Sequence, residues 1–512
     1  MIQKYPVGLQ DFGKIRTENF VYVDKTEFVY KMADIGGYYF LSRPRRFGKS
    51  LFISTLECLF LAKKELFKGL YIEDKWNWEQ TNPIIRISFS NIGHKEKGLS
   101  RAIDDELNSI AKEYGIVLEE NVISGKFKEL IETLSAIRGK VVVLIDEYDK
   151  PIIDYLGDKT ETGGVPQAIE NRDIMKAFYS ILKDADPHLK LVFITGVSKF
   201  SRVSIFSDLN NLTDITTDKH FGAVCGISET ELDAHFVEEL KLYDKNRIRE
   251  WYNGYSWDLK TSIYNPFSLL HFFRGEVFKN YWFESGTPTF LIKLSEKAHL
   301  YDFEEIEIGA DGLSAYDIQK LEIIPLMFQT GYLTMKSYNE INQFYTLGYP
   351  NKEVRSSYLQ VLMSAYSQTD AGFGVVYVDK IRQYLERGEI DRVESILNTI
   401  FKSLPYELWQ KENEHFYHAI IHLTFTLLGV YVQSEVQTSD GRMDALIRLK
   451  DYVYCIEFKL DESADKAIQQ IKEKGYLVPF VHEDKKLIAI GINFSSEKKK
   501  VEELKWEEVW VK

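Results

Sequence analysis

The sequence predicts an α/β protein with a three-layer domain around a parallel sheet, a mainly helical middle domain and a second, smaller α/β domain. Three observations support this prediction. Between residues 38 and 206, short apolar segments alternate with amphipathic helical segments, which is the pattern of a parallel sheet covered by helices. From about residue 226 the chain is rich in aromatic residues, with Gly and Pro between short helical segments. Roughly the last hundred residues return to strands and helices in alternation.

The bulk composition restricts the class of protein. A chain of 512 residues is too long for one hydrophobic core, so several domains are expected. The net charge of −13 argues against a protein that coats nucleic acid by charge alone, although local basic grooves are compatible with it. The first residues lack an apolar signal segment, and the most apolar stretch, 418–432, is short and contains two histidines. The three cysteines lie far apart, without disulfide or zinc spacing. We therefore expect a cytoplasmic protein with no membrane partner.

The first domain is expected to span residues 1–225. Its strands should be short, apolar and bounded by polar turns, and helices should lie between them. The predicted strands are Tyr38–Leu41, Ile84–Phe89, Val141–Ile145 and Leu191–Thr195, and two of the predicted helices are Ser50–Ala62 and Leu99–Glu113.

The stretch SRPRRFGKS, residues 42–50, ends like a phosphate-binding loop but does not begin like one. The usual pattern G-x-x-x-x-G-K-[ST] has a glycine where this chain has Arg43, and the following Pro44 has no N–H to donate. Arg43 adopts positive φ less readily than glycine, so the loop is expected to leave its strand by another route. Arg45 and Arg46 would supply positive charge where amides are lost. The alternative is an exposed basic turn before a helix.

The order strand, loop, helix still favours a phosphate site, because backbone N–H groups and the helix dipole at such a junction hold anions. Gly48 would let the backbone approach the phosphates. Lys49 would pair with the outer phosphates, and Ser50 would bind Mg²⁺.

An acidic pair follows the predicted strand Val141–Ile145. We expect this strand next to the phosphate loop, where Asp146 would hold Mg²⁺ through water and Glu147 would polarise the attacking water. Two acids that merely open a turn are the alternative. The order and spacing of the segments favour the core of a nucleotide hydrolase.

The strand Leu191–Thr195 ends in a polar residue that would lie near the γ-phosphate. Thr195 and Lys199 are candidates for contact with it, whereas Ser198 is better interpreted as an ordinary loop residue. Arg202 is a candidate for completing the site of a neighbouring subunit, which would make the protein a homo-oligomer.

The middle of the chain is expected to form a mainly helical domain, 226–366, followed by a helical connector, 367–405, with two helices separated near Gly388. Ser228 and Glu231 have the spacing of a capping box that starts a helix. A winged-helix role in DNA binding is less favoured, because aromatic residues more often pack cores and no basic recognition helix is evident. Asn351 is better explained as a helix cap than as a base contact.

Several motifs together resemble the AAA-ATPase-like family of bacterial and archaeal proteins. They are YVDKTEF, FLSRPRRFGKS, LIDEYDKPI, FITGVSKFS and FSDLNNLTDIT, with YNGYSW, YNPFSLL and YWFESGTPTFL extending the resemblance through the second domain. The phosphate loop of that family characteristically lacks the first glycine. The resemblance implies a P-loop NTPase fold, a lid or winged-helix-like middle domain, and ATP as the ligand. The residues expected to contact ATP or its Mg²⁺ are Arg45, Arg46, Phe47, Gly48, Lys49, Ser50, Leu51, Asp146 and Thr195, with Glu147 as catalytic residue.

The last domain, 406–512, contains a second group of charged residues. Glu457 and Lys459 are two apart on one predicted strand, so both side chains point to the same face. A hairpin around Lys450 and Asp451 would bring Asp444, just after the tight turn at Asp440-Gly441, to that face. The predicted elements are the helices Glu412–Leu428 and Ala464–Lys474 and the strands Tyr431–Gln437, Met443–Leu449, Tyr452–Lys459 and Lys486–Ile492.

Two carboxylates and a lysine are what metal-dependent phosphodiester cleavage requires. Asp444 and Glu457 would hold Mg²⁺ or Mn²⁺, and Lys459 would orient the water or stabilise charge. Family members frequently end in a PD-(D/E)xK nuclease domain, which implies a restriction-endonuclease-like fold. Glu414, Gln470 and Tyr476 are further candidates, the last two matching a Q…Y element of some of these nucleases. The alternative is a plain Glu–Lys ion pair on one face of a strand.

Two functions remain open at this point. The first is an ATPase coupled to a metal-dependent nuclease that acts on DNA, with nucleotide binding gating cleavage. The second is a switch-type regulatory ATPase whose C-terminal domain only docks nucleic acid or protein.

Overall fold

The computed structural model describes residues 4–156, 164–198, 205–206, 209–284, 289–298, 300–301, 303–314, 322–367, 373–402, 420, 423–428 and 445–509. Contacts divide the chain into two compact units: Met1–Phe290 with Phe303–Glu353, and Leu291–Asp302 with Val354–Lys512. Residues 226–290 and 303–353 thus belong to the same unit as the N-terminal sheet. The boundaries predicted after residues 225, 366 and 405 stay predictions.

The core of the first unit is a five-stranded parallel sheet in the order β2-β3-β4-β1-β5. The strands are β1 (Gly37–Ser42), β2 (Ile84–Ser88), β3 (Val141–Asp146), β4 (Leu189–Gly196) and β5 (Leu212–Asp214). Four of them were predicted, and their ends lie within two residues of the predicted ones. All residues of β3 are buried, which is why it is a continuous apolar run. The short edge strand β5 was not predicted.

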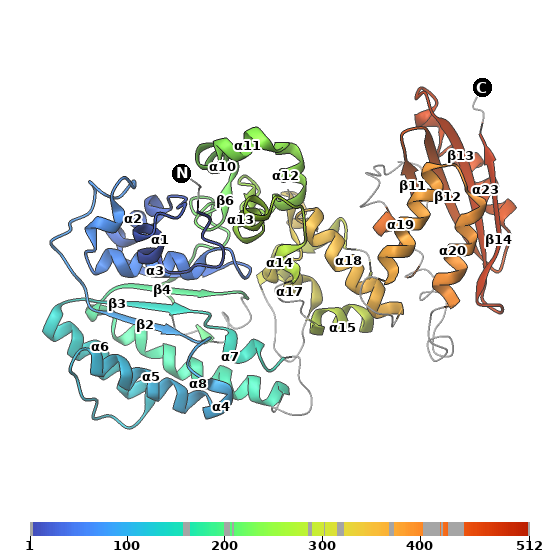
Figure 1. Ribbon diagram of the computed structural model, residues 1–512. Coiled ribbons are helices and arrows are strands. Elements are labelled where there is room, and N and C mark those ends of the chain that lie inside the picture. Colours follow the sequence, from blue (N-terminus) through green and yellow to red (C-terminus); the bar gives the residue numbers. More distant parts are fainter. Residues whose placement is uncertain are drawn as a thin grey trace. The chain divides into compact units, whose positions relative to one another are not determined.

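Helices cover both faces of this sheet and produce three layers (Figure 1). On one face, residues such as Phe40 and Ile194 share a core with α5, α6 and α8. On the other face Phe52 of α3 packs on Phe193 of β4, with ring centroids 5.4 Å apart. The helices are α1 (Phe12–Thr17), α2 (Thr26–Ile35), α3 (Lys49–Phe60), α4 (His94–Lys97), α5 (Leu99–Glu113), α6 (Ile123–Arg138), α7 (Lys150–Ile153) and α8 (Gly164–Asp184), with 3₁₀ turns at Lys64–Phe67 and Asp186–His188.

The strand order places one strand between the phosphate loop and the acidic pair. β4 lies between β1 and β3, so the acidic strand is not the direct neighbour of the strand that leads into the phosphate loop. A parallel crossover can skip a position in the sheet, and the sequence of β3 does not encode which strand it joins. As a consequence, the end of β4 stands between the two motifs.

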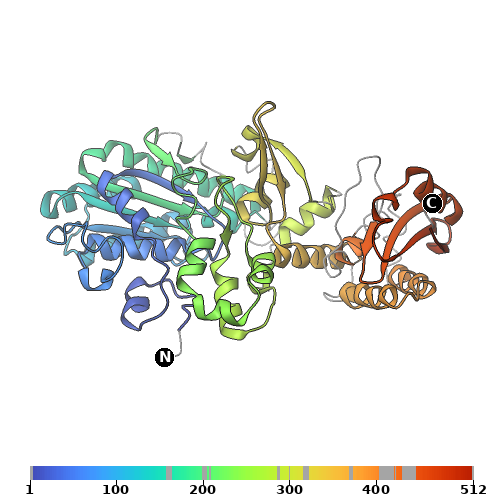
Figure 2. The same cartoon turned by 90° about the horizontal axis from the view of Figure 1, so that it is seen from above.

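Short helices and two small sheets complete the first unit. The capping box predicted at Ser228 and Glu231 is confirmed at the start of α10. Besides the predicted helices, this region contains a three-stranded antiparallel sheet, β8-β10-β9, which appears in yellow in Figure 2 and was not predicted. The elements are α10 (Glu229–His235), α11 (Val237–Leu242), α12 (Lys245–Tyr252), α13 (Pro266–Gly275), α14 (Tyr281–Glu284), α16 (Ala310–Ser314), α17 (Ile323–Thr330), β6 (Ile227–Ser228), β7 (Ile263–Tyr264), β8 (Ile306–Gly309), β9 (Thr334–Asn339) and β10 (Phe344–Gly348).

The second unit contains a mixed four-stranded sheet in the order β11-β12-β13-β14. One face packs on α23, and on the other face Tyr454 donates to the carbonyl of Leu385 in α19 at 2.7 Å. The elements are α15 (Thr289–Lys297), α18 (Lys352–Ser367), α19 (Phe373–Glu386), α20 (Asp391–Lys402), β11 (Ala445–Arg448), β12 (Tyr452–Leu460), α23 (Ala464–Lys474), a 3₁₀ turn at Val478–Phe480, β13 (Lys486–Ser495) and β14 (Lys500–Glu508), and the first residues of α15 and α18 belong to the first unit.

Most of the predicted elements of this unit are confirmed. β11 and β12 form the hairpin around Lys450 and Asp451, α19 and α20 are separated near Gly388, and α23 has the predicted ends. β14 was not predicted. The predicted strand Tyr431–Gln437 and most of the helix Glu412–Leu428 lie outside the described residues. None of the helices in the described part of the chain is long and apolar enough to cross a membrane.

Candidate functional site

The phosphate loop connects β1 to α3 and does leave its strand by an unusual route. The N–H of Arg43 donates to the carbonyl of Gly196 at 3.2 Å, so the chain stays extended one residue beyond β1. Positive φ angles occur later, at Arg46 with 67° and at Gly48 with 98°. Gly48 is also the N-cap of α3, where a left-handed backbone favours glycine. The turn that the first glycine ordinarily makes is therefore displaced toward the helix.

Arg43 is a buried structural residue of this loop. Its side chain is fully buried and donates to the carbonyls of Ser42 at 2.9 Å and Thr216 at 2.8 Å. Its guanidinium lies 4.1 Å from the ring centroid of Trp257. Burial lowers the pKa of Arg43 to about 10, so the group remains charged at neutral pH. The alternative of a wholly exposed basic turn is wrong for this residue, whereas Arg45 and Arg46 are exposed.

Lys49 is buried inside the loop. Its Nζ donates to the carbonyls of Arg43 at 2.8 Å and Pro44 at 3.0 Å. Burial lowers the pKa of Lys49, and the nearby carboxylates of Asp146 and Glu147 act in the opposite direction. The loop thus holds an ammonium group beside the acidic pair.

The acidic pair and Thr195 meet at the carboxyl ends of β3 and β4. Asp146 is buried, and the hydroxyl of Thr195 donates to its Oδ1 at 2.7 Å. Glu147 has a left-handed backbone, with φ of 51°, which is rare for a residue with a side chain. Burial raises the pKa of Glu147, and the charge of Lys49 opposes this rise. The structure therefore brings together Lys49, Asp146, Glu147 and Thr195.

Asp149 holds this arrangement in place, and sequence reasoning gave it no role. Its Oδ2 accepts from the N–H of Val197 at 3.0 Å, the N–H of Ser198 at 2.7 Å and the hydroxyl of Ser198 at 2.8 Å. The N–H of Tyr148 donates to the carbonyl of Thr195 at 3.0 Å, and its hydroxyl donates to the carbonyl of Ser198 at 2.8 Å. The turn after β3 and the turn after β4 are therefore joined by several hydrogen bonds. The second aspartate of the stretch DEYD was the available signal. Lys199 and Arg202 lie outside the described residues.

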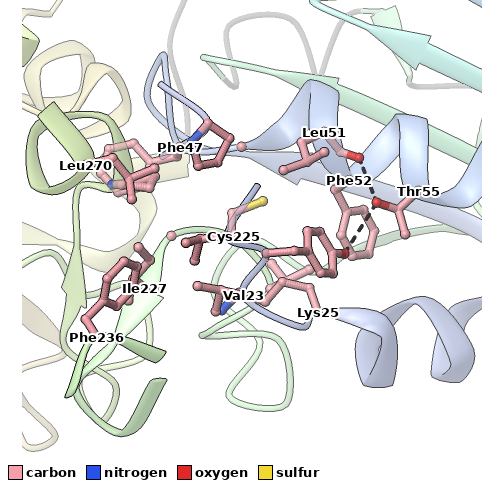
Figure 3. A pocket seen from close by; sticks show the side chains of 17 residues that line it. Val23, Lys25, Phe47, Leu51, Phe52, Thr55, Cys225, Ile227, Phe236 and Leu270 are labelled. Atoms are coloured by element: carbon pink, nitrogen blue, oxygen red, sulfur yellow. Dashed lines mark hydrogen bonds between the residues drawn. The ribbon is translucent and has the colours of Figure 1, made fainter. Parts of the chain in front are cut away.

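An apolar pocket opens directly beside the phosphate loop (Figure 3). Together with space that is continuous with solvent, it encloses about 590 Å³. Four segments surround it: the N-terminal stretch, the phosphate loop with α3, the stretch around β6, and α13. The lining includes Val23, Lys25, Phe47, Gly48, Leu51, Phe52, Thr55, Cys225, Ile227, Phe236 and Leu270. Of these, sequence reasoning had assigned only Phe47, Gly48 and Leu51 to a nucleotide.

The side chains of Lys25 and Thr55 at this pocket are hydrogen-bonded to other groups of the protein. The Nζ of Lys25 donates to Glu231 Oε1 at 2.5 Å and to the carbonyl of Ala223 at 2.8 Å. The hydroxyl of Thr55 donates to the carbonyl of Leu51 at 2.9 Å, one of the bonds drawn in Figure 3. The remaining lining is mostly apolar.

A second cluster lies on β12 and α23 of the C-terminal sheet. Glu457 is buried, with 3% of its surface exposed. Lys459 Nζ donates to Glu457 Oε1 at 3.2 Å and to Gln470 Oε1 at 2.7 Å. Gln470 Nε2 donates in turn to the same oxygen of Glu457. The Glu–Lys ion pair of the alternative interpretation is thus present, and Gln470 extends it to a cluster of three.

The close packing of α23 brings Gln470 to this cluster. Gly491 of β13 pairs in register with Glu457, and a Cβ at Gly491 would lie 2.1 Å from the carbonyl oxygen of Ala464. Only glycine allows the start of α23 to lie this close to the sheet. Tyr476, the other residue of the expected Q…Y element, is buried in the core between α23 and the sheet.

The sequence predicts further carboxylates beside Glu457, from Asp444 and Glu414. Asp444 and Glu414 lie outside the described residues, and within the described part no group of three metal-binding side chains occurs. Ala445, which follows Asp444 in the sequence, pairs with Ile456, the residue before Glu457.

Two family models match the chain, a predicted AAA-ATPase over residues 6–206 and the PD-(D/E)XK nuclease superfamily over residues 412–504. A protein of Azotobacter chroococcum mcd 1, described as "Uncharacterized protein in vnfD 5'region", is 38% identical over 513 residues and is matched over 98% of both chains. The chain belongs to the AAA-ATPase-like family. The solved structure of the Aeropyrum pernix ORC1 protein in complex with DNA covers 65% of this chain and 91% of its own, with 10% identity and a TM-score of 0.27, a likeness too low to support any argument.

In this AAA-ATPase-like protein the phosphate loop, the acidic pair and the turn after β4 all lie within the segment matched by the ATPase model. Part of the pocket does not, because Cys225, Ile227 and Leu270 follow that segment. The cluster of Glu457, Lys459 and Gln470 lies within the segment matched by the nuclease model.

Proposed function

We propose that this AAA-ATPase-like protein binds and hydrolyses ATP, and that its C-terminal domain is a metal-dependent DNA nuclease. The observation that supports the first part best is the convergence of Lys49, Asp146 and Thr195 beside an apolar pocket. A triphosphate would bind at the phosphate loop, and the adenine ring would occupy the apolar pocket beside it.

The residues of the loop fit a nucleotide with Mg²⁺. The hydroxyl of Ser50, in the first turn of α3, and the carboxylate of Asp146 are hard oxygen donors of the kind that Mg²⁺ prefers. Bound Mg²⁺ would neutralise phosphate charge. Lys49 would exchange the carbonyls of Arg43 and Pro44 for phosphate oxygens, because its ammonium group lies at the same loop.

Asp146 and Glu147 would have different roles in hydrolysis. Asp146 is fixed by the hydroxyl of Thr195, so its orientation is set before ligand binds. Glu147 would accept a hydrogen bond from the attacking water and orient it toward the γ-phosphate. Its raised pKa makes its carboxylate a stronger base than an exposed glutamate. We assign Glu147 as the catalytic residue of hydrolysis.

The C-terminal cluster supports the nuclease part. Glu457 would supply a carboxylate to a divalent metal ion, Mg²⁺ or Mn²⁺, and Asp444 would supply the second. The metal ion would lower the pKa of a bound water. Lys459, held by Gln470, would orient that water or stabilise the charge that develops on the scissile phosphate. Nucleotide binding in the first unit would gate this cleavage.

Two matched variants test the assignment. We expect Lys49→Ala to abolish ATP binding, measured by titration calorimetry of the full-length protein, and to leave metal-dependent DNA nicking without its nucleotide control. We expect Lys459→Ala to bind ATP as the wild type does and to lose nicking. Each variant serves as the folding control of the other.

The outcomes separate the two functions. ATP hydrolysis that survives in Lys49→Ala would contradict the assignment of the phosphate loop. If the wild type hydrolyses ATP but leaves single-stranded, duplex and branched DNA intact with Mg²⁺ and with Mn²⁺, the nuclease part is wrong. The C-terminal domain would then be a docking module of a switch-type regulatory ATPase.

A further inference from the structure

Residues far downstream in the sequence contact the phosphate loop at every position from 43 to 47. Each residue from 43 to 47 contacts a residue of the first unit between Tyr255 and Gly331. The contacts are Arg43 on Trp257 at 4.1 Å, Pro44 against Gly331, the carbonyl of Arg45 with Trp282 Nε1 at 3.0 Å, Arg46 on Phe267 at 4.1 Å, and Phe47 with Tyr255 and Trp257 at 4.8 and 5.5 Å between ring centroids. We call the residues Tyr255, Trp257, Phe267 and Trp282 the aromatic clasp.

The loop needs such support because its own sequence does not fix its shape. It lacks the first glycine, Pro44 donates no N–H, and Arg46 adopts a left-handed backbone. A residue with a side chain in that region costs roughly 1 kcal/mol or more and persists only where the surroundings hold it. The aromatic clasp provides that restraint.

Trp282 makes the directional contact of the clasp. Its side chain is buried, and its indole N–H donates to the carbonyl of Arg45. In a planar trans peptide, the carbonyl and the next N–H point in opposite directions. Fixing the carbonyl of Arg45 therefore fixes the direction of the N–H of Arg46, one of the amides of the loop.

The backbone of Trp282 is fixed by a hydrogen bond to Glu353. Its backbone N–H donates to Glu353 Oε1 at 2.7 Å, and the hydroxyl of Ser268 donates to the same oxygen at 3.0 Å. Glu353 is fully buried. The backbone of Trp282 is thus hydrogen-bonded to a buried carboxylate of the first unit.

We propose that Trp282 is a positioning residue for nucleotide binding, which acts by holding the phosphate loop in its binding shape through the carbonyl of Arg45. This inference rests on the proposed binding of ATP. According to this inference, the conformation of the phosphate loop depends on its contacts with the aromatic clasp and not on the loop sequence alone. By linkage, a ligand that requires this shape also stabilises the clasp.

The test is Trp282→Phe in the full-length protein, which removes the N–H and keeps an aromatic ring. We expect the affinity for ATP to fall by about tenfold, the effect of losing one buried hydrogen bond to the loop. The affinity for adenosine, which has no phosphates, should stay within about twofold. The matched control is Trp251→Phe, because Trp251 of α12 packs on Phe278 and makes no contact with the loop among the contacts of the described residues.

Two readouts separate positioning from general damage. A merely structural loss would weaken ATP and adenosine alike and lower the melting temperature, whereas the proposal requires a selective loss for ATP. In the wild type, ATP should also slow amide exchange in residues 252–275, and this protection should shrink in Trp282→Phe. Equal ATP affinity in Trp282→Phe and wild type would overturn the inference, and no ATP binding by the wild type would instead overturn the proposed function.

Discussion

Asp149 offers the sharpest test of how the ATP site is built, through the substitution Asp149→Ala. One carboxylate oxygen accepts three hydrogen bonds, from the N–H of Val197 and from the N–H and hydroxyl of Ser198. Alanine leaves all three donors buried without their acceptor. At about 1 kcal/mol or more for each donor, the turn after β4 should lose roughly 3 kcal/mol. Burial raises the pKa of Asp149, so removing the carboxyl also relieves a desolvation cost, which places the effect at the lower end.

The assay has a local and a functional part. Amide exchange followed by mass spectrometry should show residues 189–198 exchanging on the order of a hundredfold faster than in the wild type. This factor corresponds to a loss of about 3 kcal/mol in the free energy of local opening. Because Thr195 and Asp146 would lose their fixed geometry, kcat for ATP hydrolysis should fall by about a hundredfold. The affinity for ATP should change little, since Asp149 does not line the apolar pocket and the hydrogen bonds of Lys49 to the carbonyls of Arg43 and Pro44 are kept.

A matched control is Asp218→Ala, which removes a partly exposed carboxylate that accepts one N–H, from His220 at 2.8 Å. We expect this variant to differ from the wild type by no more than about 0.5 kcal/mol and to retain full hydrolysis. If Asp149→Ala exchanges and hydrolyses like Asp218→Ala, the connection between the two turns does not support the site, and the reasoning fails.

Two further predictions concern the C-terminal cluster and the acidic pair. Gly491→Ala should destabilise the C-terminal domain by about 1–3 kcal/mol and reduce nicking. The reason is that its Cβ would lie 2.1 Å from a backbone oxygen and displace α23. The control in thermal unfolding is Gly309→Ala, because a Cβ at Gly309 has no atom within 4 Å. Lys150→Met should shift the acidic limb of the pH–rate profile of ATP hydrolysis to higher pH, because the charge of Lys150 lowers the raised pKa of Glu147 and its loss disfavours the carboxylate. A limb that stays in place, or moves to lower pH, would exclude Glu147 as the group that titrates.

The sequence by itself determined the strands and helices that carry the two groups of motifs, although β5, β14 and the sheet β8-β10-β9 were not predicted. The apolar run of β3 is short and bounded by polar turns, which favours a buried strand. The periodicity of α5 and α23 predicted both helices, because hydrophobic spacing reflects which face of a helix is buried. Glu457 and Lys459 were placed on one face by strand geometry, and the structure joins them in one cluster. Their roles in metal binding and catalysis remain predictions.

Only the tertiary structure decided which segments meet. The position of β4 between β1 and β3, the bonds from Asp149 to the turn after β4, and the contact of Trp282 with Arg45 all join residues separated by tens to hundreds of positions. The pocket draws its lining from four separate segments. Local periodicity shows that a side chain is buried but not against which partner, because the partner is chosen by how whole strands and helices pack.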